Sequence, residues 1–176
     1  LPNRDFLSGA AEMLKTFIIE DNENYYDAVG LLSEMNMQYY SRMAEGEDET
    51  EVWQCCIENY SGELLKLICE AAKVKAGVVS RDQFEGGERR KLNLGHTFAH
   101  AIETLAQREN AKPRGADEDG GDDAPKDITH GEAVAIGLSQ ISHLSHRLGL
   151  LSAHDMERID SLLTKIGFEI SLPVPM

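Results

Sequence analysis

Two histidines spaced four residues apart are the side chains of this sequence best suited to chemistry. His96 and His100 fall in a stretch whose apolar residues have helical spacing, and positions i and i+4 share one face of a helix. Asn93 and Arg89 precede His96 by about one and two helical turns. We interpret this stretch as a face that can hold a metal ion together with an anionic, hydroxylated ligand. Histidine pairs at this spacing more often have no ligand, so the surrounding residues must decide the interpretation.

The residues around this pair belong to a series of sequence blocks that span most of the chain. The blocks read LPNR at 1–4, GAAEMLK at 9–15, KAGVVSRDQFE at 75–85, RRKLNLGHTFAHAIE at 89–103 and HGEAVAIG at 130–137. In this order they resemble the C-terminal half of the 3-dehydroquinate synthase family, within the sugar-phosphate cyclase superfamily. Any one block would be a weak indication, whereas the joint match is specific.

The resemblance implies a metal centre formed by one carboxylate and two imidazoles. Carried over block by block, its ligands are Glu12, His96 and His130. Three protein ligands of nitrogen or oxygen type with an open fourth position are typical of a catalytic Zn²⁺ site, and the same donors suit Co²⁺ or Fe²⁺. Spacing alone would not select Glu12 from the 31 acidic residues of the chain.

The resemblance also implies an anionic phosphorylated sugar-acid substrate, 3-deoxy-arabino-heptulosonate 7-phosphate. The residues implied in binding it are Lys15, Lys75, Arg89, Asn93 and His100. Lys75, Arg89 and Asn93 would hold its carboxylate and phosphate, and an arginine can do so with two parallel hydrogen bonds. Lys15 would bond a ring hydroxyl beside the metal.

Three residues are implied in catalysis: Lys15, Glu85 and His100. His100 would lie near the phosphate end of the substrate, with Glu85 as the hydrogen-bonding partner for proton transfer. The implied reaction is that of a phosphate-eliminating carbon–oxygen lyase in the shikimate pathway of aromatic amino acid biosynthesis. NAD⁺ would oxidise a substrate hydroxyl to a ketone, phosphate would leave by elimination, and the ketone would be reduced again.

Members of this family bind NAD through an N-terminal domain. Residues 1–176 contain no GxGxxG loop between a strand and a helix, so no cofactor-binding residue is expected in them. We expect the NAD-binding domain and a C-terminal lysine-bearing segment to lie outside this chain, and the isolated chain to be inactive. The partners implied are this NAD-binding domain and, in the full enzyme, a second subunit of a homodimer.

Three other functions stay open from the sequence. Another sugar-phosphate cyclase, one that forms a cyclitol, would not have to hold a substrate carboxylate. A metal-dependent polyol dehydrogenase with a similar two-domain plan would not need Arg89 and His100 to bind phosphate. A helical metal-binding domain without catalysis would bind metal and show no turnover even with the missing segments restored.

Helices must position these side chains, because the alternation typical of β-strands is nearly absent. Helical periodicity predicts elements over 8–19, 24–43, 50–75, 92–108, 129–148 and 153–166. A break is expected near Ser61, a turn at 81–87 and a helix N-cap at Thr129. Residues 109–127, rich in glycine, proline and acidic residues, predict a flexible acidic loop. The fold class is therefore predicted to be all-α: one multi-helical domain that binds metal and substrate.

The chain is strongly acidic, with a formal net charge of −14 at pH 7. This charge argues against nucleic acid or an anionic membrane as a partner of the whole surface. The sequence has no signal peptide and no membrane-spanning run. Cys55, Cys56 and Cys69 have apolar neighbours at helical spacing, so buried thiols in a reducing compartment are expected. Together these features predict a cytoplasmic location.

Overall fold

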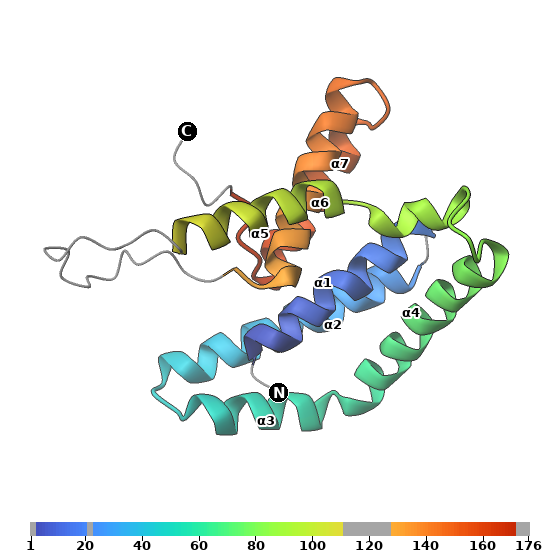
Figure 1. The fold of residues 1–176 in the computed structure, drawn as a ribbon. Helices are drawn as coiled ribbons and strands as arrows, with labels where there is room; N and C mark the ends of the chain where they lie inside the picture. The colour runs from blue at the N-terminus through green and yellow to red at the C-terminus, as the bar shows by residue number, and fades with distance from the viewer. Residues whose placement is uncertain (1–2, 21–22, 111–127, 172–176) are drawn as a thin grey trace, which may run out of the picture.

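The computed structural model describes residues 3–20, 23–110 and 128–171, without the side chains of 109 and 110. All the regular structure of these residues is helical (Figure 1). In chain order they are α1 (Asn3–Ile19), α2 (Asn24–Ala44), α3 (Glu49–Asn59), α4 (Ser61–Arg81), the short 3-10 helix η1 (Glu88–Asn93), α5 (His96–Asn110), α6 (His130–Arg147) and α7 (Ala153–Ile166). The prediction of an all-α, multi-helical fold is confirmed.

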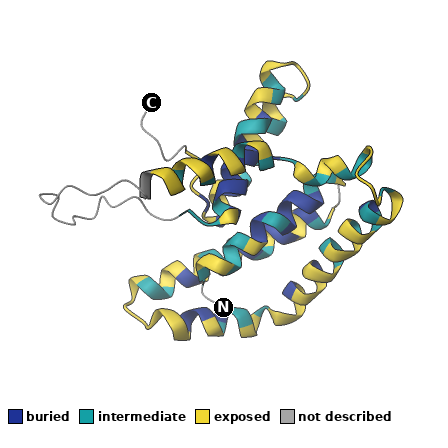
Figure 2. Cartoon of the chain, viewed as in Figure 1, coloured by how far each residue is buried: buried dark blue, intermediate teal, exposed yellow. Residues whose placement is uncertain are grey.

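The first half of α6 lies in the main core, where it packs against both α1 and α5. Its buried side chains are small or branched: Ala133, Val134, Ala135, Ile136 and Leu138. The buried residues of α1 face the same core, and Figure 2 shows this burial along α1 in contrast to the largely exposed α4. Since α1, α5 and α6 carry the three implied metal ligands, their packing sets the geometry of the site.

Two glycines of α6 allow its close approach to the neighbouring helices. A Cβ added at Gly131 would overlap the backbone of Ser8 in α1, and one added at Gly137 would overlap the carbonyl oxygen of Gly95, just before α5. The backbone N–H of Gly131 also donates a hydrogen bond of 2.8 Å to the Ser8 hydroxyl. These contacts fix the position of α6 against α1 at one point and against the start of α5 at another.

Gly137→Ala is expected to destabilise the fold, because the obstructing atom is backbone and cannot move aside as a flexible side chain could. Overpacking of this kind costs about 1–3 kcal/mol, and each kcal/mol lowers Tm by about 2–4 °C in a domain of this size. Thermal unfolding followed by circular dichroism measures the effect. Gly30→Ala in α2 is the matched control, because its added Cβ meets nothing within 4 Å. Equal Tm values for the two variants would contradict the prediction.

A second apolar cluster joins α2, α3 and the start of α4. Its buried members are Met35, Tyr39, Val52, Trp53, Cys56 and Leu64. Phe6 of α1 packs against it, with its ring centroid 5.0 Å from that of Trp53. Beyond this cluster α4 contacts α1 and then η1, which brings Lys75 to the side of α1 that carries Glu12. The predicted break near Ser61 is confirmed, although α4 continues to Arg81 and does not end at 75.

The start of the histidine helix differs from the prediction of one continuous helix over 92–108. Glu88–Asn93 form η1, Gly95 has a φ of +77°, and α5 begins at His96. Only glycine adopts this left-handed conformation without a steric cost, and the conformation interrupts the helix. The apolar spacing could not reveal the interruption, because it persists across Gly95. The prediction that Arg89 and Asn93 share a helix face with the histidines is therefore wrong.

Other local predictions have mixed outcomes. Thr129 is the N-cap of α6, and its hydroxyl accepts from the N–H of Glu132 in a reciprocal capping box, as predicted. Cys56 is buried, but Cys69 is exposed because it lies on the outer side of α4, so the prediction of three buried thiols is wrong. The expected loop at 109–127 begins later, since α5 continues through 110. Residues 111–127 lie outside the described part of the chain.

None of the helices in the described part of the chain combines the length and the apolar composition needed to cross a bilayer.

Candidate active site

Three residues far apart in the sequence meet where α1, α5 and α6 converge. Glu12 comes from the middle of α1, whereas His96 and His130 are the first residues of α5 and α6. The Nε2 atoms of both histidines lie 3.6 Å from the same oxygen, Oε1 of Glu12. One potential ligand atom from each residue lies within 4.8 Å of the others. The structure thus brings together the three residues that the sequence blocks implied, while their role as ligands stays a prediction.

The spacing of these atoms fits a single divalent ion. Ligand bonds of about 2.0–2.2 Å in a tetrahedral arrangement place neighbouring ligand atoms roughly 3.3–3.5 Å apart. The two observed separations of 3.6 Å are close to this value. A carboxylate with two imidazoles is also a donor set that Zn²⁺ and Co²⁺ favour.

Both imidazole rings are held through the nitrogen that points away from Glu12. The Nδ1 of His96 lies 3.3 Å from the carbonyl oxygen of Leu94, and the Nδ1 of His130 lies 2.9 Å from Oε1 of Glu103. With the proton on Nδ1, each ring presents the lone pair of Nε2 toward Glu12. Glu103 lies in the 89–103 block, but the block pattern did not indicate this contact.

Lys15 is buried directly beside Glu12. Its ammonium donates to both oxygens of that carboxylate, at 2.9 and 3.1 Å, and the residue is 4% exposed. Burial lowers the pKa of Lys15, while the hydrogen bond to Glu12 acts in the opposite direction. Burial also lowers the pKa of His96, and the charge of Lys15 lowers it further. The imidazole of His96 is thereby favoured in its neutral form, which is the form that binds metal.

A polar cavity of about 200 Å³ opens beside the three converging residues. Its lining consists of Glu12, Lys15, Thr16, Lys75, Glu85, Arg89, Leu92, Asn93 and His96. Four of the five residues implied in substrate binding are among them, and so is Glu85. The fifth, His100, is exposed and outside this lining, with its ring centroid 5.5 Å from that of His96. Such a cavity, with three cationic side chains, suits a small anion with several hydroxyls.

The segment between α4 and η1 positions Arg89 and Asn93 at this cavity. The carboxylate of Asp82 accepts hydrogen bonds from the backbone N–H groups of Gly86, Gly87 and Arg89, at 2.8, 2.8 and 3.0 Å. Glu85 has a φ of +57°, and its Oε1 accepts from the side-chain amide of Asn93 at 2.8 Å. Asp82 thus organises the turn between α4 and η1, and the prediction of a turn at 81–87 is confirmed. The sequence did not indicate this role of Asp82.

The pKa of Asp82 is lowered by the hydrogen bonds from the N–H groups of Arg89, Gly87 and Gly86. A carboxylate with a depressed pKa contributes stability that is present above its unfolded value of 3.8 and is lost as pH falls through the folded value. We therefore expect the amide resonances of Gly86 and Gly87 to titrate together, with a midpoint below 3.8, in two-dimensional NMR spectra. In Asp82→Asn both resonances should lack this transition. A midpoint at or above pH 3.8 for the two amide resonances of the wild type would contradict the prediction.

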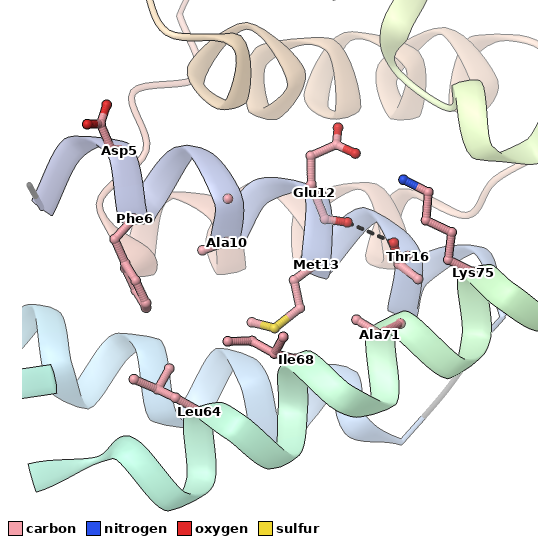
Figure 3. A pocket seen from close by; sticks show the side chains of 12 residues that line it. Asp5, Phe6, Ala10, Glu12, Met13, Thr16, Leu64, Ile68, Ala71 and Lys75 are labelled. Atoms are coloured by element: carbon pink, nitrogen blue, oxygen red, sulfur yellow. Dashed lines mark hydrogen bonds between the residues drawn. The ribbon is translucent and has the colours of Figure 1, made fainter. Parts of the chain in front are cut away.

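A longer apolar groove of about 380 Å³ leads away from the same carboxylate, between α1 and α4 (Figure 3). Phe6, Met13, Leu64 and Ile68 line its apolar part. Figure 3 shows Lys75 at one end of it on α4 and Glu12 farther along on α1, the helices that form its two sides. The two cavities therefore share Glu12 and Lys75, and the polar end of the groove is continuous with the candidate site.

An ion pair fastens the first turn of α6 to the first turn of α1. Arg4 donates through Nε and Nη2 to the two carboxylate oxygens of Glu132, at 2.8 and 2.7 Å. Glu132 also accepts from the backbone N–H of Thr129 at 2.7 Å. Both residues of the pair lie in the blocks described above, but the block pattern did not indicate that they contact each other. The pair helps to hold His130 opposite Glu12.

Comparison with known protein families shows which family the sequence of this chain matches. The family described as 3-dehydroquinate synthase C-terminal matches residues 9–176. The chain belongs to this family. Relatives named 3-dehydroquinate synthase include those of Geotalea uraniireducens, 35% identical over 98% of this chain, and Thermodesulfovibrio yellowstonii, 32% identical over all of it. The Pentafunctional AROM polypeptide of Kluyveromyces lactis is 34% identical over 98% of the chain.

The 3-dehydroquinate synthase relatives are considerably longer than the region they share with this chain. The match spans 38% of both bacterial synthases and 10% of the Kluyveromyces lactis polypeptide. Membership of the C-terminal family is thus shown for the region that contains Glu12, His96 and His130.

Proposed function

We propose that this chain is the metal- and substrate-binding domain of a 3-dehydroquinate synthase. In that role it takes part in the NAD-dependent conversion of 3-deoxy-arabino-heptulosonate 7-phosphate to 3-dehydroquinate with elimination of phosphate. The observation that carries the proposal is the junction of Glu12, His96 and His130 with a cavity lined by Lys15, Lys75 and other polar residues. Membership of the family supports it.

The metal centre and the cations have separate tasks in this proposal. Glu12, His96 and His130 would hold a divalent ion, which would supply Lewis-acid chemistry by lowering the pKa of a substrate hydroxyl and polarising a carbonyl at the same carbon. Lys15, fixed beside Glu12, donates a hydrogen bond to that hydroxyl. Lys75 contacts the substrate from α4, across the cavity from α1. The protein thus contributes position and charge, while NAD carries the hydride.

The anionic groups of the substrate are assigned to the segment between α4 and α5. Arg89 donates one hydrogen bond, of 2.8 Å, to the carbonyl oxygen of Gln83, which holds its guanidinium at the cavity. Its other donors are then suited to a carboxylate or a phosphate. Asn93 donates a hydrogen bond of 2.8 Å to Glu85, and the two residues form the adjoining wall. The carboxylate of Glu85 can accept a proton from a bound hydroxyl and return it. His100 is proposed at the phosphate end.

The NAD needed for hydride transfer is proposed to bind chiefly to a separate domain of the complete enzyme. Family membership makes such a domain the natural partner of this chain, because NAD and metal serve one reaction in the family. The described part of this chain would then supply the metal side of the substrate site. This division agrees with the match of the chain to 38% of each bacterial synthase.

Binding to the Zn²⁺-loaded chain tests the proposed substrate class. Three ligands are compared by isothermal titration: 3-deoxy-arabino-heptulosonate 7-phosphate, a ketose phosphate without the carboxylate, and an unphosphorylated polyol. We expect 3-deoxy-arabino-heptulosonate 7-phosphate to bind most tightly, because only this ligand carries both a carboxylate and a phosphate for the cationic side chains to contact. Tighter binding of the ketose phosphate would favour a cyclitol-forming cyclase, and tighter binding of the polyol would favour a polyol dehydrogenase.

A further inference from the structure

The carboxylate of Glu103 lies behind the candidate metal centre and contacts one of its three ligands. Its Oε1 is 2.9 Å from Nδ1 of His130, while Nε2 of the same ring faces Glu12 at 3.6 Å. A neutral imidazole that donates from Nδ1 must carry its lone pair on Nε2. The contact therefore selects both the plane of the ring and the tautomer that can bind metal.

The fold places Glu103 here through α5. Glu103 follows His96 by seven residues, or about two turns, so both side chains lie on one face of this helix. One face of α5 thus supplies one ligand, His96, and the partner of another ligand on α6. The close contact of Gly137 with Gly95 keeps the two helices in the register that this arrangement needs.

The Nδ1 atoms of His96 and His130 face different kinds of hydrogen-bond acceptor. Nδ1 of His96 faces a neutral carbonyl oxygen at 3.3 Å, whereas Nδ1 of His130 faces a carboxylate at 2.9 Å. The side chain of His130 is also the more exposed, at 45% against 16% for His96. An exposed ring at the first residue of a helix is held little by packing and depends on its hydrogen bond for a fixed orientation. A carboxylate partner also makes the ligating nitrogen more basic.

We infer that Glu103 is a positioning residue of the metal centre, which orients His130 and strengthens it as a ligand. The inference rests on the proposed metal-binding function. Outer partners of this kind affect metal affinity by roughly 10- to 100-fold. Glu103 is not among the residues that line the polar cavity, and its contact with the site is the hydrogen bond to His130.

Titration of Co²⁺ into the chain, followed by calorimetry and by the visible spectrum of the bound ion, tests this inference. Glu103→Ala is expected to bind Co²⁺ roughly 10- to 100-fold more weakly than the wild type. Glu103→Gln keeps an acceptor without the charge, so an intermediate loss and a shifted spectrum are expected. Glu157→Gln, at an exposed position of α7, is the control for loss of one negative charge and should bind as the wild type does.

A second measurement separates positioning from a general loss of structure. In long-range ¹H–¹⁵N spectra of the Zn²⁺-loaded wild type, His130 should show a protonated Nδ1, and in Glu103→Ala this signature should weaken while the far-ultraviolet circular dichroism is unchanged. Wild-type Co²⁺ affinity and spectrum in both Glu103 variants would overturn the inference and leave the metal centre intact. Failure of the wild type to bind Co²⁺ at one site would overturn the metal centre itself.

Discussion

His96→Ala is expected to weaken the binding of Zn²⁺ or Co²⁺ to this chain by roughly 100-fold to several hundredfold. Structural zinc sites with four ligands bind with about 10–16 kcal/mol, so one ligand accounts for about 2.5–4 kcal/mol. His96 points its Nε2 at Glu12 from the first turn of α5 and is held there by the carbonyl of Leu94. Isothermal titration of the metal into the folded variant measures the loss.

The control for this prediction is a histidine of the same chain outside the site. His154 is exposed on α7, and His154→Ala should retain wild-type affinity. Similar affinities for the two variants would show that the ion binds elsewhere. Helix content, measured by circular dichroism, should be the same in both, because the fold does not depend on the metal for its core.

Arg89→Ala is expected to remove most of the turnover of a complete synthase that contains this domain, with little effect on folding. Loss of a charged contact to an anionic ligand costs about 2–5 kcal/mol, which is roughly a thirtyfold to several-thousandfold loss in rate. Arg89 is half-buried at the cavity, where its guanidinium is held by the carbonyl of Gln83. Steady-state kinetics of phosphate release measure the effect on kcat/KM.

Lys91→Ala is the matched control for Arg89→Ala. Lys91 carries the same charge on the same short helix η1 but is exposed and absent from the lining of the cavity. Its replacement should leave kcat/KM within about twofold of the wild type. Wild-type kinetics in Arg89→Ala would refute the assignment of Arg89 to the substrate.

The helices were predictable from the sequence because most of them bury one apolar face and end at recognisable residues. The cap at Thr129 and the break near Ser61 were visible in the sequence for this reason. The interruption at Gly95 was not, because the apolar spacing continues across it; in the structure Gly95 has a φ of +77° and lies against Gly137, more than 40 residues away in the sequence. A contact of this kind depends on tertiary packing, which local periodicity does not encode.

The metal triad and most of the cavity lining were implied by the family resemblance and not by spacing. Glu12, His96 and His130 lie on three different helices, and only the order of the sequence blocks linked them. The resemblance did not indicate the residues that hold these side chains in place, among them Asp82 and Glu103. Asp82 is hydrogen-bonded to a turn, and Glu103 to His130 of a neighbouring helix. Such contacts between separate elements can be identified only in the folded structure.

Glu12, His96 and His130 are proposed to bind one divalent ion together. Crystals of the chain grown with Zn²⁺ and measured on both sides of the zinc absorption edge test this proposal most directly. We expect an anomalous peak at the junction of α1, α5 and α6, about 2.0–2.2 Å from both Nε2 atoms and from an oxygen of Glu12. Zinc bound elsewhere, with these three side chains ordered and free of it, would contradict the proposal.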